Sequence, residues 1–193
     1  MDKLIYRRIT SNTAVKAYYV AGPDGQFLDD VISTYTGLLP CNWGTPPLSH
    51  EETGFFVDGK LMFFSSASRS ATNKFDNGTR WISAKELLKQ FDRWMFQIKD
   101  FTEPEIAAKI GRANGLIPMP YDYVGAVADF TILIDLVAEK KKIYCSKACH
   151  FVDTGNLRRI SPRHDWKLSK NDGWRQCSGC YVETMAMFEG GNV

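Results

Sequence analysis

The 193-residue sequence has no hydrophobic run of the roughly 18 residues that a membrane-spanning helix needs. Its most apolar stretch, residues 124–138, is interrupted by Asp129 and Asp135, which favours a buried helix and predicts no membrane span. Residues 1–10 contain no apolar signal-peptide core. We therefore expect synthesis in the cytoplasm without a standard secretory signal.

The sequence also has little net charge and few histidines. The net charge is +2, which is too small to favour nucleic acid or an anionic membrane surface as a partner. The chain has three histidines, so few residues could act as a general base near neutral pH. Its five cysteines are an odd number, and at this length they argue against a secreted disulfide scaffold.

The residues that are present are those of an ordinary globular domain. Apolar residues make up 44% and aromatic residues 13% of the sequence, enough to fill the core of one mixed domain spanning residues 1–193. Neither an internal repeat nor a low-complexity segment divides it.

A β-hairpin is the clearest local prediction. Two apolar runs flank Asp58–Gly59, a dipeptide that favours a two-residue type I′ turn. Such a turn pairs Val57 with Lys60.

The same register brings polar residues together at the open end of the hairpin. Glu52 is expected opposite Ser65, and His50 opposite Ala67. Because side chains alternate along a strand, His50, Glu52 and Ser65 should share one face.

Capping patterns mark two helices. Ser83 and Glu86 predict a helix over residues 84–99, and Thr102 and Glu105 predict another that ends near Gly115. Further expected elements are strands at 4–9 and 14–21, helices at 27–37 and 121–138, and a short helix from Cys145. This order predicts an α+β domain.

The cysteines allow two interpretations. Cys145, Cys149, Cys177 and Cys180 could form a zinc site, because the second pair has the spacing of a zinc knuckle. The first pair has three intervening residues and lies in a segment with helical character, which fits a knuckle less well. Alternatively, one thiol is a nucleophile.

Cys145 is the candidate nucleophile because it begins a predicted helix. A helix N-terminus lowers a thiol pKa, and its N–H groups can bind an oxyanion. His150 follows at i+5 and points about 140° away on the same helix, while His164 is expected in a polar surface loop. The remaining candidate base is His50, with Glu52 two residues along the strand.

Three segments resemble the permuted NlpC-like cysteine hydrolases of the papain-like superfamily. Residues 49–69 are similar to the strand pair that carries the histidine, residues 120–125 to the Pro-Tyr-x-Trp-Gly segment, and residues 144–152 to the helix that carries the nucleophile. The histidine precedes the cysteine, as in the permuted members. The resemblance implies a papain-like, circularly permuted core over about residues 25–155, with a small antiparallel sheet packed against helices, and a C-terminal extension over residues 156–193.

The resemblance also assigns roles to residues. Cys145 matches the nucleophile, His50 the base, Glu52 the group that orients the imidazole, and Tyr121 the tyrosine near the oxyanion. Glu51 departs from the pattern, since many members have an aliphatic residue there.

The implied function is that of a cysteine peptidase or amidase that needs neither metal nor other cofactor. Its expected substrate is the stem peptide of peptidoglycan, cleaved by a cell-wall hydrolase or antibacterial effector toxin. Such a protein would be delivered to the periplasm of a target cell or encoded by a phage, with a delivery or immunity protein as partner. The alternatives are a thiol acylhydrolase acting on lipids or isopeptides, and a zinc-stabilised binding module without catalysis.

Overall fold

The computed structural model describes residues 10–20, 43–67, 78–122 and 142–179, together with residues 182, 183 and 185. The expected strand at 4–9, the helix at 27–37 and nearly all of the helix at 121–138 lie outside these ranges.

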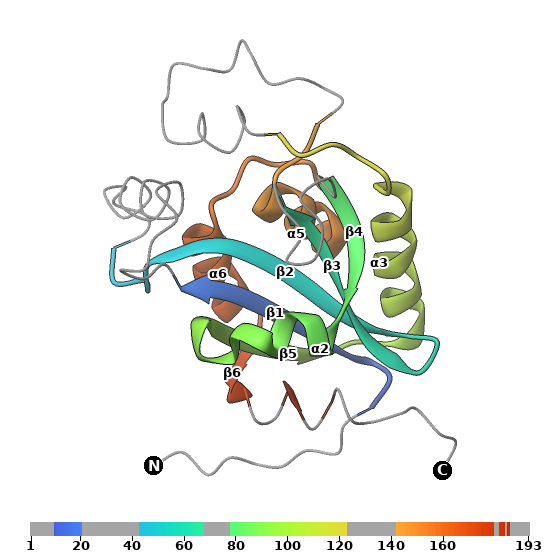
Figure 1. The fold of residues 1–193 in the computed structure, drawn as a ribbon, viewed down its shortest axis with the longest axis horizontal. Helices are drawn as coiled ribbons and strands as arrows, with labels where there is room; N and C mark the ends of the chain where they lie inside the picture. The colour runs from blue at the N-terminus through green and yellow to red at the C-terminus, as the bar shows by residue number, and fades with distance from the viewer. Residues whose placement is uncertain are drawn as a thin grey trace.

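Six strands form one antiparallel sheet in the order β4-β3-β2-β1-β5-β6 (Figure 1). The strands are β1 (Thr13–Val20), β2 (Leu48–Val57), β3 (Lys60–Ala67), β4 (Gly78–Ser83), β5 (Trp94–Asp100) and β6 (Arg175–Cys177). Together with the helices, this sheet confirms the predicted α+β class. Two of its strands, β1 and β6, come from outside residues 25–155.

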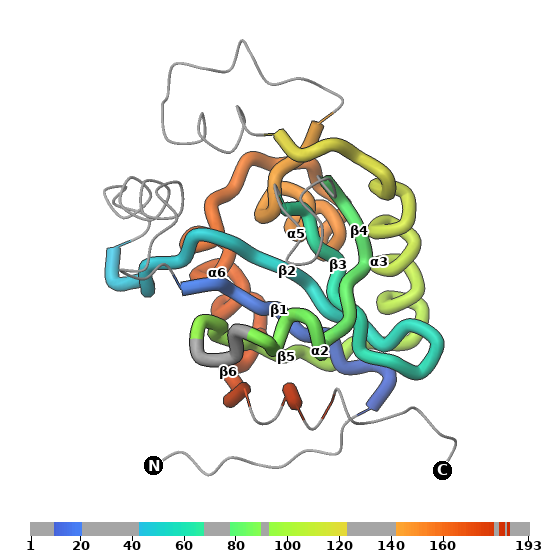
Figure 2. The backbone as a smooth tube through the Cα atoms, viewed as in Figure 1, coloured from blue at the N-terminus to red at the C-terminus, as the bar shows by residue number. Residues whose placement is uncertain are grey.

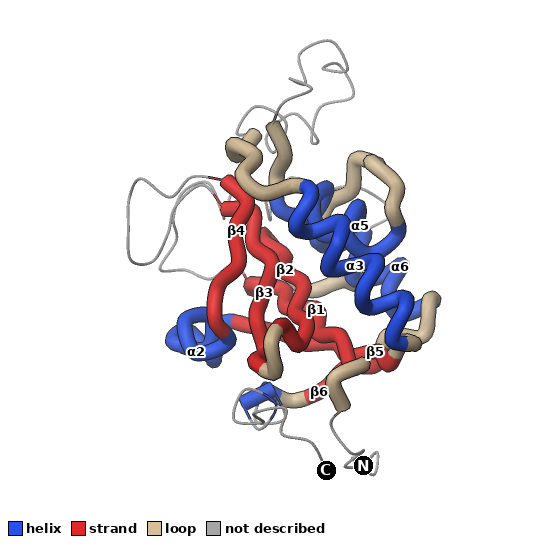
Figure 3. The backbone as a smooth tube through the Cα atoms, turned by 90° about the vertical axis from the view of Figure 1, so that its right-hand side faces the viewer, coloured by secondary structure: helices blue, strands red, loops and turns tan. Residues whose placement is uncertain are grey.

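Helices lie on both faces of the sheet. They are α2 (Ala84–Leu87), which continues into a 3-10 helix η2 (Leu88–Arg93), α3 (Glu103–Gly115), α5 (Cys145–Thr154) and α6 (Pro162–Asn171). Figure 3 shows α3, α5 and α6 on one face and α2 on the other. None of the helices in the described part of the chain is long and apolar enough to cross a membrane.

Alternating residues of each strand feed two hydrophobic cores, one on each face of the sheet. The core on the α2 side includes Val15, Ala17, Phe56, Leu61, Phe63, Leu87 and Phe96. The core beneath the other helices includes Ala14, Phe55, Phe64, Ile106, Ala148, Val152 and Trp174. This period of two is the pattern expected of strands buried on both sides.

The predicted hairpin is confirmed. Asp58–Gly59 has positive φ at both residues, 50° and 76°, as a type I′ turn requires. The β2–β3 ladder runs from the Val57–Lys60 pair to the Thr53–Phe64 pair in the predicted register. Within the described strands it ends there, so the expected Glu52–Ser65 and His50–Ala67 strand pairs do not form.

The predicted helix over residues 84–99 is wrong in its second half. Its beginning is as expected, since Ser83 Oγ accepts a hydrogen bond from the Glu86 backbone N–H. The chain then turns into β5, where Phe96 and Ile98 are buried and the strand pairs with β1 along its whole length. Burial beside β1 outweighs a helical pattern that is local to the sequence.

The C-terminal extension, for which the sequence predicts no particular helix or strand, contributes α6 and β6. Ser161 caps α6 by accepting a hydrogen bond from His164 N–H, and Pro162 occupies the first turn. The expectation of a surface loop at His164 is therefore wrong, since this residue lies in α6 and is half-buried.

Candidate active site

The site forms where the sheet opens between two neighbouring strands. On the N-terminal side of Thr53, β2 still pairs with β1, but it no longer pairs with β3. Figure 1 shows β2 and β3 diverging from their hairpin, and the same path is seen in the tube of Figure 2. The first turn of α5 lies against this opening: the Cys149 thiol donates to the Glu51 carbonyl at 3.4 Å, and the backbone of Glu51 also hydrogen-bonds to Cys145.

A bulge in β2 lies immediately before the histidine. Tyr19 is opposite His50 while Val20 is opposite Leu48, so Ser49 is an extra residue in β2. Bulges of this kind redirect neighbouring side chains and are common beside functional sites.

Backbone hydrogen bonds fix the start of α5. Ile143 N–H donates to the Pro120 carbonyl, and the Ile143 carbonyl accepts from Asp122 N–H and from Ser66 Oγ. Tyr144 is extended, with φ −102° and ψ 168°, and the helix begins at Cys145 as predicted. The thiol therefore belongs to the first residue of a helix whose position is set by β3 and by the segment around residue 120.

The Cys145 thiol and the His50 imidazole interact directly, which is the contact that the sequence predicted. Burial alone raises the pKa of Cys145, but the charge of His50 and hydrogen bonds to His50, Glu51 and Ser146 bring it below its ordinary value. Burial alone lowers the pKa of His50, but Cys145 and then Glu52 raise it from 6.5 to about 10. Both directions favour a thiolate paired with an imidazolium.

Glu52 holds the other side of the imidazole. Its Oε1 lies 3.2 Å from His50 Nε2, and the same oxygen accepts a hydrogen bond of 2.7 Å from Ser65 Oγ. Since Glu52 engages Nε2, Nδ1 is the ring nitrogen that is available to the sulfur. The predicted shared face of His50, Glu52 and Ser65 is thus confirmed, although β2 and β3 no longer pair there.

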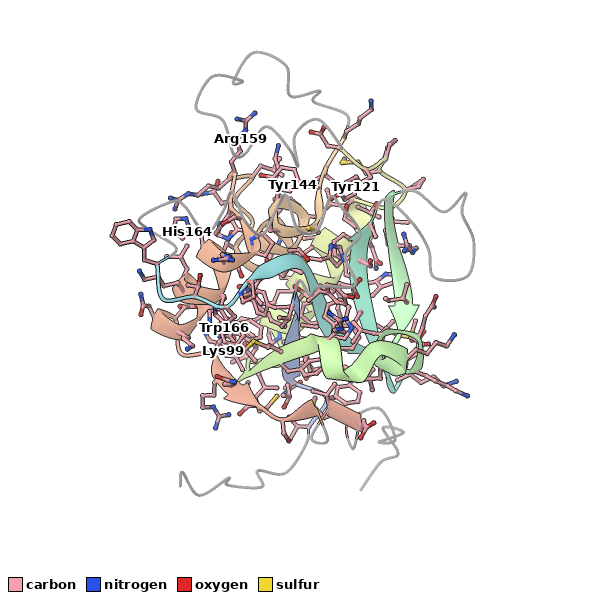
Figure 4. All side chains as sticks on the ribbon, turned by 60° about the vertical axis from the view of Figure 1, so that its left-hand side comes forward. Lys99, Tyr121, Tyr144, Arg159, His164 and Trp166 are labelled. Carbon is pink, nitrogen blue, oxygen red and sulfur yellow. The ribbon has the colours of Figure 1, made fainter. Side chains whose placement is uncertain are left out.

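Tyr121 lies close to the nucleophile along the chain path. It forms an isolated parallel bridge with Ile143 and packs against Tyr144, the residue before Cys145. Figure 4 shows Tyr121 and Tyr144 at the same end of the molecule. The backbone N–H groups of the first α5 turn precede the first intrahelical hydrogen bond, from Ala148 N–H to Tyr144 O.

The cysteines that the structure describes, Cys145, Cys149 and Cys177, do not gather around a common point. Cys149 faces the Glu51 carbonyl, while Cys177 lies on β6 against the core on the α2 side. Among the residues that the structure describes, no group of three or more metal-binding side chains occurs. Cys180 lies outside the described ranges.

A buried ionic cluster behind the site was not predicted. Glu51 points to the opposite face of β2 from His50, towards Lys16 of β1 at 3.7 Å. Lys16 also contacts Asp165 at 2.5 Å and Asp153 at 3.3 Å. His150, which the helical period aimed away from Cys145, lies 3.3 Å from Asp165.

The sequence carried only a weak signal for this cluster. A lysine in the middle of an apolar strand, Lys16, is unusual, but its partners are far away in sequence. Burial and the charge of Asp165 raise the pKa of Glu51 well above its usual range, while the charge of Lys16 lowers it. The departure from the resemblance at Glu51 is therefore accommodated by Lys16 and Asp165.

No protein-family model matches the sequence, and no curated protein matches it closely enough to count as a relative.

Proposed function

We propose that the protein is a cysteine hydrolase that cleaves amide bonds, with Cys145 as nucleophile and His50 as base. The observation that supports this proposal best is the direct contact between these two side chains, which come from segments 95 positions apart (145 − 50). A thiol, a base and a carboxylate in series are the parts that acyl transfer by a cysteine requires.

The geometry supports a two-step reaction. The Cys145 thiolate attacks the carbonyl carbon and forms a carbon–sulfur bond, while backbone N–H groups at the α5 N-terminus and the Tyr121 hydroxyl bind the oxyanion. The His50 imidazolium gives its proton to the amine as the carbon–nitrogen bond breaks. His50 then takes a proton from water, which hydrolyses the thioester and releases the acid.

Glu52 and Ser65 would serve as positioning residues in this reaction. The hydrogen bond from Ser65 fixes the Glu52 carboxylate, and Glu52 fixes the ring of His50. A negative carboxylate beside the ring also stabilises the imidazolium form.

The substrate part of the proposal rests on the resemblance to permuted NlpC-like hydrolases. A histidine strand that precedes the cysteine helix, with a tyrosine-bearing segment just before that helix, fits their order. We therefore propose a peptidoglycan stem peptide as the substrate, cleaved by a cell-wall hydrolase or antibacterial effector that acts in the periplasm of a target cell.

The first test is selective alkylation at neutral pH. Iodoacetamide should modify Cys145 much faster than Cys149 or Cys177, because burial raises the pKa of both other thiols, that of Cys177 to about 12. Mass spectrometry of tryptic peptides over time measures each rate. Equal slow labelling of all three thiols would contradict a nucleophilic Cys145.

The second arm tests the reaction itself. Purified peptidoglycan is digested with the wild type, Cys145→Ala and Cys149→Ala, and the products are analysed by mass spectrometry. Cleaved stem peptides should appear with the wild type and Cys149→Ala and be absent with Cys145→Ala. If Cys145 is labelled fast but no cleaved stem peptides appear, the nucleophile proposal stands and the peptidoglycan substrate is wrong.

A further inference from the structure

The buried ionic cluster draws the two acids within α5 and α6 inward, and the exposed Asp172 at the end of α6 pairs with Lys99. In the continuous segment from residue 142 to residue 171, the acidic residues are Asp153 and Asp165. Asp165 is buried against Lys16, and Asp153 lies against Lys16 and Lys109 of α3. Both acids are thus neutralised from other elements, inside the molecule.

The cations of the same segment reach the surface. We call five of them the cationic face: Arg158, Arg159, Arg163, Lys167 and Lys170. Arg158, Lys167 and Lys170 are exposed, and the other two are half-buried.

The spacing within α6 puts three of these cations on one side of the helix. Arg163, Lys167 and Lys170 follow at four and three residues, which is the helical repeat. The buried residues of α6 are Pro162, Asp165, Trp166 and Ser169. The three cations therefore lie along one side of α6, next to its buried side, where Lys170 contacts the ring of Trp166 and Arg163 is half-buried.

The loop before α6 extends this row of cations. Arg158 and Arg159 belong to this loop, and the charges of Arg158 and Lys167, after burial, lower the pKa of His164. Figure 4 shows His164 and Arg159 on the side of the molecule that α6 and the preceding loop occupy.

An exposed leucine lies within the cationic face. Leu157 precedes Arg158 and is 58% exposed, one of two large apolar side chains that are exposed in the described part of the chain. An apolar side chain among cations is the combination found where proteins insert shallowly into a bilayer surface.

We propose that the cationic face, with Leu157 at its edge, binds the surface of a bilayer that contains anionic phospholipid. The charges attract the headgroups, and Leu157 enters the boundary between headgroups and acyl chains. The attachment is peripheral, in keeping with the lack of a membrane-spanning helix among the described elements. This proposal does not depend on catalysis by Cys145.

Such binding would bring the candidate active site close to the bilayer. Ser146 Oγ donates a hydrogen bond of 2.6 Å to the Ile160 carbonyl, which ties the loop of the cationic face to the first turn of α5. Cys145 is the neighbour of Ser146 in that turn, so membrane binding through this face would hold Cys145 near the bilayer.

The test is sedimentation of the full chain with vesicles. Vesicles of phosphatidylcholine and phosphatidylglycerol in equal parts are compared with vesicles of phosphatidylcholine alone. We expect binding to the mixed vesicles only, weakened at high salt. Arg158→Glu/Lys167→Glu should lower the affinity at least about tenfold.

A matched variant controls for total charge. Lys85→Glu/Lys89→Glu makes the same change at exposed residues of α2 and η2, on the opposite face of the sheet (Figure 3), and should leave binding unchanged. Equal loss in both double variants would show attraction by net charge and overturn a defined surface. Failure of the wild type to bind mixed vesicles would overturn the proposal directly.

Leu157→Ser separates a bilayer from a soluble polyanion. It should reduce vesicle binding several-fold while leaving retention on heparin unchanged. If heparin binds as tightly as the mixed vesicles and Leu157→Ser affects neither, the face binds an anionic polymer and the bilayer proposal is wrong. Circular dichroism of every variant confirms that the fold is retained.

Discussion

The imidazole of His50 lies between a thiol and a carboxylate, and this position determines its protonation. Burial opposes a charged ring, but the pKa of His50 is nevertheless raised to about 10 by Cys145 and Glu52. The half-buried edge of the ring faces Trp94, with 6.2 Å between ring centroids. Both neighbours therefore favour the imidazolium form of the ring at neutral pH.

This pairing predicts the pH dependence of the thiol. The thiolate–imidazolium pair should persist from the lowered pKa of Cys145 up to pH about 10, where His50 loses its proton. Because the folded pKa of His50 lies above its ordinary 6.5, its stabilising effect is complete below that value and is lost as the pH rises through 10. The ultraviolet absorbance of the thiolate, taken as the difference from Cys145→Ser, should already be present at pH 7.

Glu52→Gln gives the matched test of the same pair. The amide keeps the shape of the side chain but removes its charge, so the pKa of His50 should fall and the alkaline limit of the pair should move to lower pH. A thiol that titrates near its ordinary pKa of 9 in both the wild type and Glu52→Gln would contradict the pairing.

At the scale of elements, the start of a helix is easier to predict from this sequence than its end. The capping residues Ser83 and Thr102 marked helix starts correctly, because a cap satisfies backbone N–H groups through residues three positions away. The end of the helix at Leu87 was missed because the signal for β5 is its pairing with β1, some 80 residues earlier. The start of α6 had a readable signal, a serine followed by Pro162.

The hairpin offers a sharp prediction about packing. A Cβ built on Gly54 would lie 2.7 Å from Cε1 of Phe63, which is fully buried across the strand pair. Gly54→Ala should therefore reduce the free energy of unfolding by about 1–3 kcal/mol, as measured by urea denaturation.

Gly111→Ala is the control for that substitution. Gly111 lies within α3, and an added Cβ would have nothing within 4 Å. This variant should be more stable than the wild type by about 0.5–1 kcal/mol, because alanine favours the helix. A Gly54→Ala variant as stable as the wild type would show that the ring of Phe63 can move aside.

At the scale of the whole molecule, the Lys16 cluster joins the sheet to two helices. Its members come from β1, β2, α5 and α6, and Lys16 is only 1% exposed. Burial alone would lower the pKa of Lys16, but the three carboxyl groups around it raise the pKa above its ordinary value. The cluster thereby sets how α5 and α6 are placed against the strand that carries His50.

Removing the charge of Lys16 should strongly reduce the free energy of unfolding. Lys16→Met leaves buried acids without their counter-charge, and we expect a loss of about 3–5 kcal/mol in the free energy of unfolding. Lys99→Met, which breaks a 2.8 Å ion pair with the exposed Asp172, should cost less than about 1 kcal/mol. Thermal and urea unfolding measure both, and a similar small loss in the two variants would mean that Lys16 does not hold the cluster together.

The sequence predicts the residues of the candidate site better than it predicts the buried ionic cluster around Lys16. Cys145, His50 and Glu52 could be nominated from the sequence because helix starts, strand alternation and the order of motifs leave local patterns. The partners of Lys16 leave none, since an aspartate on the polar side of a helix and one that is buried look the same in a sequence. Only the packing of α6 on β1 and β2 identifies Asp165 as a partner of Lys16.

The bond between Lys16 and Asp165 joins residues 149 positions apart, which has a consequence for biosynthesis. A ribosome-bound chain already contains Cys145 and His50 before Asp165 has been translated, and at that stage the lysine on β1 has no such acid to bind. At that stage α5 already contacts β2 and β3, and Asp153 can pair with Lys16, but the bond that α6 supplies is still missing. We therefore expect the buried ionic cluster to be completed only after α6 has been translated.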